Sequence, residues 1–387
     1  PPDDKYAMVI ENTTPIVLIR DPDLIKQITV KDFDHFQDHR QFFSEKHDPL
    51  LGASLLMLKG EKWKDMRTTL SPAFTGSKMK QMVPFIDEIS KNIVEYLKTS
   101  QTIHVDDLIR RYTNDVILSV AFGLQVNSLK DKENEMYLSG QKLSSFSLWQ
   151  RICMFAILSF PKFAKVSKLL LPIFWLKNNS VIDSTMKHRE SNKIHRPDMI
   201  QLLMEAAKVK VEMLNYIATD KTKLKLLVEE LTAQAFIFYF AGFESSASAL
   251  VMTIHELALN KDIQNKLYAE CKKAHEEQKD MTIELVQELK YLDMVINETL
   301  RKWSPALIMD RECIKPYTLP PPRPSGKPYR KGDIVYNSVN SLHMDKKYYP
   351  EPELYDPERF SDENKHNIKP FTFMPFGMGP RNCIGKI

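Results

Sequence analysis

The N-terminal segment AMVIENTTPIVLIRDPDLIKQI contains two short apolar runs, separated by polar, turn-forming residues at Asn12–Pro15. Apolar runs of this length around a turn predict two short β-strands. Asp21 followed by Pro22 is typical of a helix start, because aspartate accepts hydrogen bonds from free N–H groups and proline has no N–H to satisfy. We therefore expect a small sheet and then a helix that begins after Asp21.

From about Glu61 to Trp303 the apolar positions recur mostly with the period of a helix. The longest stretch, Leu226–Leu259, would extend about 50 Å at 1.5 Å per residue. Its segment LTAQAFIFYFAGF is apolar on nearly all sides, which predicts a helix in the middle of the fold. The best uninterrupted apolar runs, Leu169–Leu176 and Ala235–Phe243, have eight and nine residues. Both are shorter than the roughly 20 residues that span a bilayer.

After Trp303 the chain becomes rich in proline. The segment LPPPRPSGKPYRKGDIVYNS predicts a hairpin, with Leu319–Pro324 extended, a turn at Ser325–Gly326 and a strand at Asp333–Tyr336. A polyproline ligand for a partner domain is a weaker interpretation. The whole pattern predicts a mainly α protein with small β-sheets, in which residues 1–387 form a single large helical domain.

Composition and charge exclude several classes of protein. The net charge of +4 is too small, and its lysines and arginines too scattered, to indicate nucleic acid binding. The four cysteines, Cys153, Cys271, Cys313 and Cys383, lie far apart and form no C-x-x-C pair. This spacing argues against a disulfide framework and against a zinc site, and it fits a reducing compartment. The segment PPDDK lacks the basic start and apolar core of a secretory signal peptide.

Cys383 lies in the segment PFGMGPRNCIGKI, which holds three of the protein's eleven glycines. Gly377, Gly379 and Gly385 allow the backbone to turn tightly and to approach a flat partner closely. Arg381 places a cation two residues from the sulfur, and a helix expected after Cys383 would direct its N–H groups near it. Both effects favour the thiolate over the thiol.

A thiolate at a helix start serves as a nucleophile, as half of a redox dithiol or as a metal ligand. A nucleophile needs a histidine partner and a redox pair needs a second cysteine, and the segment contains neither. A lone buried cysteine is usually only a small hydrophobic residue, but the glycines and Arg381 argue against that interpretation. Axial ligation of haem iron fits best, since thiolate donation favours O–O bond cleavage.

The ten residues FGMGPRNCIG, Phe376–Gly385, resemble the haem-binding loop of the cytochrome P-450 monooxygenases. The resemblance covers nearly the whole chain and implies haem b as cofactor, O2 as co-substrate and Cys383 as the axial ligand of the iron. Phe376 and Arg381 would belong to the same cofactor site. The segments GEKWKDMRTTLSPAFTGSKMKQM and NKHNIKPFTFMPFGMGPRNCIG look most like those of insect microsomal members that oxidise plant toxins and insecticides.

Two further motifs resemble those of the family. Trp63 and Arg67, one helical turn apart, match its W-x-x-x-R, whose tryptophan N–H and guanidinium bind a haem propionate. Glu298, Arg301 and Arg359 match its E-x-x-R and P-E-R-F segments, which form a buried network that holds the cysteine loop. Without the resemblance, Glu298 and Arg301 would be an ordinary surface ion pair that contributes under about 1 kcal/mol.

The segment FAGFESSAS, which interrupts the long helix with small residues, resembles the oxygen-binding kink A-G-x-[DE]-T of the family. The resemblance implies that Ala241 and Gly242 leave room for dioxygen, that Glu244 relays protons and that Ser245 bonds the bent backbone. Serine stands where the family has threonine and lacks the methyl group that fixes the rotamer. We therefore expect leakier proton delivery and more peroxide release.

The resemblance also implies the lining of a distal pocket, whose apolar and aromatic side chains indicate a lipophilic small-molecule substrate, either a xenobiotic or an endogenous lipid-like compound. The expected lining residues are Phe236, Phe240, Phe243, Ala306, Leu307 and Ile308, with the loop before Trp63 as a further candidate. Aromatic residues at helical spacing belong to a core more often than to a pocket.

The expected electron donor is an NADPH-dependent flavoprotein reductase, which is acidic and would meet the basic residues Lys62, Lys64, Lys365, Lys369 and Lys386. A generic solvated surface explains each lysine equally well. Microsomal members lie on the cytosolic face of the endoplasmic reticulum membrane. They have an N-terminal anchor, a helix after the cysteine and C-terminal strands, and we expect residues 1–387 to lack all three.

Two alternatives stay open at this point. The first is a truncated, non-catalytic fragment that retains no haem. The second is a haem-thiolate isomerase that needs no external electrons, although Glu244 and Ser245 argue against it.

Overall fold

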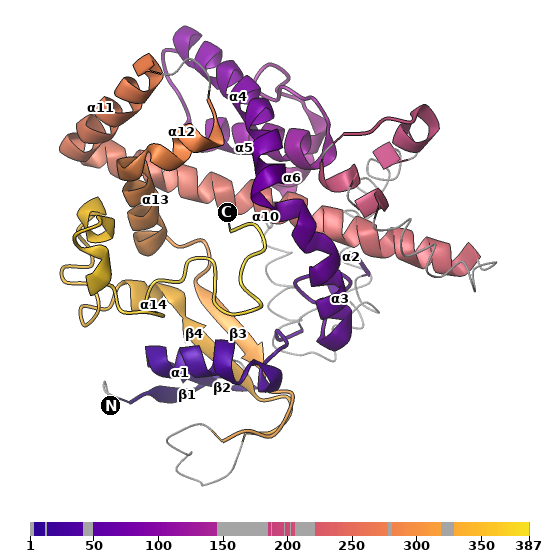
Figure 1. Cartoon of the computed structure of the whole chain (residues 1–387), viewed down its shortest axis with the longest axis vertical. Coiled ribbons are helices and arrows are strands. Elements are labelled where there is room, and N and C mark those ends of the chain that lie inside the picture. The colour runs from indigo at the N-terminus through magenta and orange to yellow at the C-terminus, as the bar shows by residue number, and fades with distance from the viewer. Residues whose placement is uncertain are drawn as a thin grey trace. The chain divides into compact units, whose positions relative to one another are not determined.

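The computed structural model describes residues 4–11, 14–41, 49–144, 185–186, 188–196, 198–201, 203–205, 221–277, 281–318 and 329–386. The chain forms two compact units, and Figure 1 labels their helices and strands. Unit 1 comprises Pro1–Arg40 and Ser248–Ile387, and unit 2 comprises Gln41–Ala247. The mainly α fold with a small sheet that the sequence predicts is confirmed.

Unit 1 contains a four-stranded sheet in the order β1-β2-β4-β3. Its strands are β1 (Tyr6–Glu11), β2 (Thr14–Ile19), β3 (Ile308–Glu312) and β4 (Ile334–Ser338). The two N-terminal strands pair antiparallel, as predicted, and β4 lies between β2, to which it is parallel, and β3, to which it is antiparallel. Strands from both ends of the sequence therefore share one sheet, which the alternation of apolar residues does not reveal.

The helix predicted after Asp21 is α1 (Pro22–Lys26), in which the Asp21 carboxylate accepts a hydrogen bond from the Leu24 N–H at 3.0 Å. A π-helical turn (Gln27–Lys31) and a 3₁₀ turn (Phe33–His35) continue it. A buried cluster of unit 1 joins α1, the sheet and the chain that leads to Cys383. Its members include Val17, Ile25, Phe36, Met309, Val335 and Met374.

The remaining helices of unit 1 follow the end of the long helix. They are α11 (Lys261–Glu277), α12 (Ile283–Glu288), α13 (Lys290–Lys302) and α14 (Val339–His343), with 3₁₀ turns at Pro357–Phe360 and Lys365–Asn367. A second buried cluster, which includes Leu267, Tyr291 and Val295, packs α13 against α11. This packing fixes the helix that carries Glu298 and Arg301.

Unit 2 is helical in its described residues. Its elements are α2 (Pro49–Gly52), α3 (Gly60–Leu70), a 3₁₀ turn (Ser71–Phe74), α4 (Gly76–Thr99), α5 (Val105–Phe122), α6 (Glu135–Ser144) and most of α10 (Lys221–Leu259). Gly123 ends α5 with φ of 66°, a left-handed conformation that suits glycine at a helix C-terminus. Aromatic side chains of α5, α6 and α10, namely Phe122, Tyr137, Tyr239 and Phe243, pack together in this unit.

The predicted long helix Leu226–Leu259 is confirmed as α10, which begins at Lys221. By length and composition, its residues Glu230–Leu259 also qualify as a candidate membrane span, although the core helix of a soluble protein meets the same criteria. The length of uninterrupted apolar runs therefore underestimates how apolar this helix is. A single polar residue such as Glu244 ends an uninterrupted run, whereas mean hydropathy is averaged over many residues of the helix.

Some sequence predictions lie outside the described residues, namely the strand Leu319–Pro324, the turn Ser325–Gly326, the apolar run Leu169–Leu176 and Cys153. An antiparallel bridge pairs Tyr317 with Tyr329 on either side of the proline-rich segment. The predicted strand at Asp333–Tyr336 is β4, which begins one residue later.

Candidate functional site

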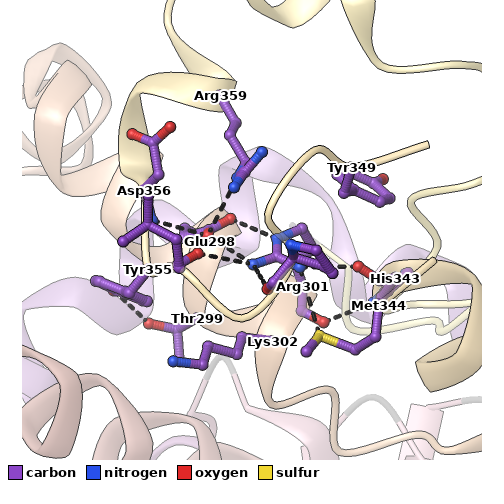
Figure 2. A network of polar contacts seen from close by, with 12 residues as sticks. Glu298, Thr299, Arg301, Lys302, His343, Met344, Tyr349, Tyr355, Asp356 and Arg359 are labelled. Carbon is purple, nitrogen blue, oxygen red and sulfur yellow. Dashed lines mark hydrogen bonds and ion pairs between the residues drawn. The ribbon is translucent and has the colours of Figure 1, made fainter. Parts of the chain in front are cut away.

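Glu298 and Arg301 form a buried ion pair on α13, with both side chains fully enclosed (Figure 2). The Arg301 guanidinium donates to both carboxylate oxygens of Glu298, from Nε at 2.7 Å and from Nη2 at 2.8 Å. The Arg359 Nε lies 3.6 Å from Glu298 Oε1, and the Asp356 N–H donates to the same oxygen at 2.9 Å. The structure thus brings the three charged residues expected from the sequence into one network.

Arg301 also donates to backbone carbonyls that are distant in sequence. They belong to His343 at 2.8 Å, Pro352 at 2.7 Å and Leu354 at 3.3 Å. Because one guanidinium satisfies carbonyls from α14 and from the irregular chain after it, Arg301 organises the segment that leads toward the cysteine loop. Such a network is costly to break, since a buried charge without its partner typically destabilises a protein by about 3–5 kcal/mol.

The cysteine loop is held by backbone hydrogen bonds and by two left-handed glycines. The Cys383 N–H donates to the Phe376 carbonyl at 2.7 Å, and the Gly377 N–H donates to the Met374 carbonyl at 3.1 Å. Gly377 and Gly379 have φ of 73° and 75°. The Cys383 side chain is exposed, and the half-buried Phe376 precedes the loop. A thiol on a tight, glycine-built turn is therefore open to a bulky flat partner.

Arg381 does not extend into solvent beside the sulfur. Its guanidinium is buried, donates from Nε to the Gln37 carbonyl at 2.9 Å and lies 3.4 Å from Asp38 Oδ1. Burial lowers the pKa of Arg381 to about 9; the nearby Arg311 adds to the effect and Asp38 opposes it. Residues 384 and 385, directly after Cys383, form a turn.

Arg311 and His39 are candidate site residues that the sequence did not single out. Arg311, on β3, is only 3% exposed, and its Nε atom has no hydrogen-bond partner in the described structure. Its Nη2 lies 3.4 Å from the Met378 carbonyl of the cysteine loop, and its Nη1 lies 3.4 Å from His39 Nδ1. Burial lowers the pKa of Arg311 to about 10 and also lowers the pKa of His39. No local motif marks these residues, because only the pairing of strands brings them to the loop.

Arg311 and Arg381 are two buried cations beside the cysteine loop, whereas His39, whose Nδ1 lies 3.0 Å from Asp310 Oδ1, has a lowered pKa that favours its neutral form. Arg381 already faces Asp38 at 3.4 Å, whereas the Arg311 Nε has no hydrogen-bond partner among the described residues, so a carboxylate beside Arg311 would offset the desolvation of its charge. The two propionates of a haem are carboxylates, and an arginine fork suits a carboxylate. The residues of unit 1 therefore fit a haem that is bound through Cys383.

Trp63 and Arg67 lie one turn apart on α3 of unit 2. Trp63 is buried and Arg67 is half-buried, so neither is a freely solvated side chain. Their spacing places them on one side of the helix, as the sequence indicates.

Close packing against α5 explains the glycine at position 242 of α10. A methyl group at Gly242 would lie 2.8 Å from the Ile117 Cδ1 atom, so glycine allows α5 to approach α10 closely. The helix is continuous through this segment. Ala241 and Ser245 are both exposed, and the Ser245 hydroxyl donates to the Ala241 carbonyl at 2.6 Å.

Glu244 is not the solvated carboxylate that an isolated helix residue would be. Its Oε2 atom accepts a hydrogen bond from Arg110 Nη1 of α5 at 2.6 Å, and Arg110 also contacts Asp106 at 2.9 Å. The expected acid is thus held by a cation from a neighbouring helix.

The aromatic residues expected in a substrate pocket occupy different environments. Phe243 is fully buried, stacked on Tyr239 at 6.0 Å between ring centroids and packed edge-on against Tyr137. Phe236 is buried with Leu50 and Ala53. Both pack against neighbouring residues of unit 2, and their place in a substrate pocket stays a prediction. Phe240 and Ala306 are half-buried, whereas Leu307 and Ile308 are 60% and 53% exposed.

Three of the lysines expected to face an electron donor pair with carboxylates instead: Lys64 with Glu61, Lys365 with Asp362 and Lys369 with Asp23. Their positive charge is partly neutralised locally, which weakens the argument for a basic docking surface.

Comparisons with known proteins show the family to which the chain belongs. A family model described as Cytochrome P-450 matches residues 4–387. Probable cytochrome P-450 9f2 from Drosophila melanogaster is 44% identical over 405 residues, which cover 98% of this chain and 76% of that protein. Cytochrome P-450 9e2 from Blattella germanica is 41% identical over 411 residues, with the same shares covered. Cytochrome P-450 6k1 from Blattella germanica is 35% identical over 394 residues, covering 96% and 73%. This chain, with its exposed cysteine on a glycine-built loop, belongs to the cytochrome P-450 family of haem-dependent monooxygenases.

Proposed function

We propose that this enzyme inserts one oxygen atom from O2 into a lipophilic small molecule, with electrons that pass from NADPH through a flavoprotein reductase. The substrate class is a xenobiotic or an endogenous lipid-like compound, and the cofactor is haem b. The observation that carries the proposal is the exposed Cys383 thiol beside the buried cations Arg311 and Arg381. The proposal places the enzyme on the cytosolic face of the endoplasmic reticulum membrane, where microsomal members of the family meet their reductase.

Different residues of the chain would bind different parts of the haem. Bound through Cys383, the haem would supply an iron centre that activates O2. Arg311, Arg381 and His39 would hold its carboxylates, and Phe376 would cover the loop beside the sulfur. Trp63 and Arg67 are proposed as further carboxylate donors, on the basis of the W-x-x-x-R motif.

On α10 the exposed Ala241 and Ser245, with Gly242 between them, would line the part of the site that binds O2. Glu244 would carry protons to this part of the site, and Ser245 would donate a hydrogen bond there. The exposed apolar residues Leu307 and Ile308, with the half-buried Phe240 and Ala306, would contact the lipophilic substrate.

The proposal is tested by the absorption spectrum of the reduced protein with carbon monoxide. The chain is expected to show the far-red-shifted Soret band of a thiolate-ligated haem, and Cys383→Ser is expected to lose that shift. Absence of any haem absorbance from the unmutated chain would favour the alternative of a fragment that retains no haem. Consumption of NADPH with added reductase then separates a monooxygenase from an isomerase, which needs no external electrons.

The role of Glu244 is tested by two substitutions that break the same ion pair. Glu244→Gln removes the proton carrier and is expected to lower coupled turnover by roughly 100-fold, a typical contribution of acid–base catalysis. Arg110→Gln removes the partner but keeps the carboxylate, and it is expected to retain most of the activity. Product formed per NADPH consumed is the measurement. Equal losses in the two variants would mean that Glu244 acts only through its ion pair with Arg110.

A further inference from the structure

His343, the last residue of α14, is fully buried and bonded at both ring nitrogens. Its Nδ1 lies 3.0 Å from the Arg301 carbonyl, and its Nε2 lies 2.9 Å from the Met374 backbone nitrogen. An N–H group can only donate, so Nε2 must accept from Met374 and Nδ1 must carry the hydrogen that binds Arg301. The contacts therefore specify a neutral imidazole with one tautomer.

His343 and Arg301 are joined by two reciprocal hydrogen bonds (Figure 2). The Arg301 Nη1 donates to the His343 carbonyl at 2.8 Å while the ring binds the Arg301 carbonyl. Burial lowers the pKa of His343 to about 4, to which the charge of Arg301 adds, so the ring stays neutral at physiological pH. The ring also stacks on Phe373, with centroids 5.3 Å apart.

Met374 is the point at which this arrangement reaches the cysteine loop. Its side chain is 1% exposed in the buried cluster that joins α1 and the sheet, and its carbonyl accepts the Gly377 N–H at 3.1 Å. Phe376, two residues later, accepts the Cys383 N–H. A continuous series of hydrogen bonds thus runs from Glu298 through Arg301, His343 and Met374 to the first glycine of the loop.

We propose that His343 is a positioning residue, whose ring fixes Met374 to the buried Glu298–Arg301 pair and so sets the placement of the Cys383 loop. The donor at one nitrogen and the acceptor at the other are both required. This role concerns the protein chain itself, and only its spectroscopic readout rests on the proposed function.

The test compares His343→Gln, His343→Leu and His255→Gln. Glutamine offers a donor and an acceptor on one side chain, leucine fills similar space with neither, and His255 is an exposed histidine of the same unit. Hydrogen–deuterium exchange is measured on the haem-free chain, on peptides that cover residues 371–384 and on peptides from β2 and β4. In His343→Leu the loop peptides are expected to exchange about tenfold faster while the sheet peptides keep their rate. His343→Gln should restore most of the protection, and His255→Gln should match the unmutated chain.

The second readout is the share of carbon monoxide-bound haem that shows the far-red-shifted band. We expect this share to fall severalfold in His343→Leu and to recover in His343→Gln. Unchanged loop exchange in His343→Leu, equal acceleration in the sheet peptides, or no recovery in His343→Gln would each overturn the proposal, as would unfolding of both variants. If the unmutated chain binds no haem, the proposed function fails, whereas the exchange experiment still decides the role of His343.

Discussion

Glu298→Ala is expected to abolish haem incorporation. The substitution leaves Arg301 fully buried without its carboxylate, removes the acceptor of the Asp356 N–H and takes away the charge that Arg359 faces. Loss of one member of such a network should lower the free energy of unfolding by about 3–5 kcal/mol. Because Arg301 also organises the chain around His343, the cysteine loop should lose its fixed position. Haem content per folded chain and urea unfolding of the apoprotein measure the two effects.

Glu256→Ala is a matched control for this prediction. Glu256 is also a buried carboxylate of unit 1, bonded to Lys302 at 2.9 Å and to the Trp303 indole at 2.7 Å. No described contact connects it to the cysteine loop, so the variant should lose stability but keep its haem content per folded chain. Normal haem content in Glu298→Ala would contradict the assignment of the network. Equal haem loss in both variants would show that general destabilisation, rather than loop placement, is responsible.

Gly379→Ala is expected to have the second largest effect. Gly379 has φ of 75°, and a methyl group built on it would lie 1.9 Å from the Thr29 carbonyl oxygen, a backbone atom that cannot turn aside. A left-handed alanine costs roughly 1–2 kcal/mol and overpacking typically another 1–3 kcal/mol. We therefore expect urea unfolding to show a loss of several kcal/mol, together with reduced haem retention, because the loop must move away from Thr29.

Gly332→Ala separates the cost of the left-handed backbone from the cost of steric overlap. Gly332 also has a positive φ, of 94°, but a methyl group there meets nothing within 4 Å. Only the backbone strain should appear, at roughly 1–2 kcal/mol, with unchanged haem retention. A Gly379→Ala variant no less stable than Gly332→Ala would show that the loop does not need its close approach to Thr29.

The glycine loop, the E-x-x-R pair and the long helix could be predicted because each depends on residues that are near in sequence. Asp21 caps α1 from three residues away, and Glu298 reaches Arg301 across one helical turn. The packing of Phe243 could not be predicted in this way, because the sequence of a helix that is apolar on all sides does not reveal which sides contact neighbouring helices. The roles of Arg311 and His39 were missed for a related reason, since β3 must first be paired before they come together.

The sequence by itself determined the family, the candidate haem ligand Cys383, the tight glycine-rich turn around it and the order of helices and strands. Short-range sterics and hydrogen bonding decide these features within a few residues of chain. Only the tertiary structure decided that β4 inserts between β2 and β3, that Arg110 holds Glu244 and that His343 joins Arg301 to Met374. These contacts join residues that lie tens to hundreds of positions apart. Which residues meet depends on which surfaces pack together and on which buried polar groups then need hydrogen-bond partners. No local sequence pattern contains that information.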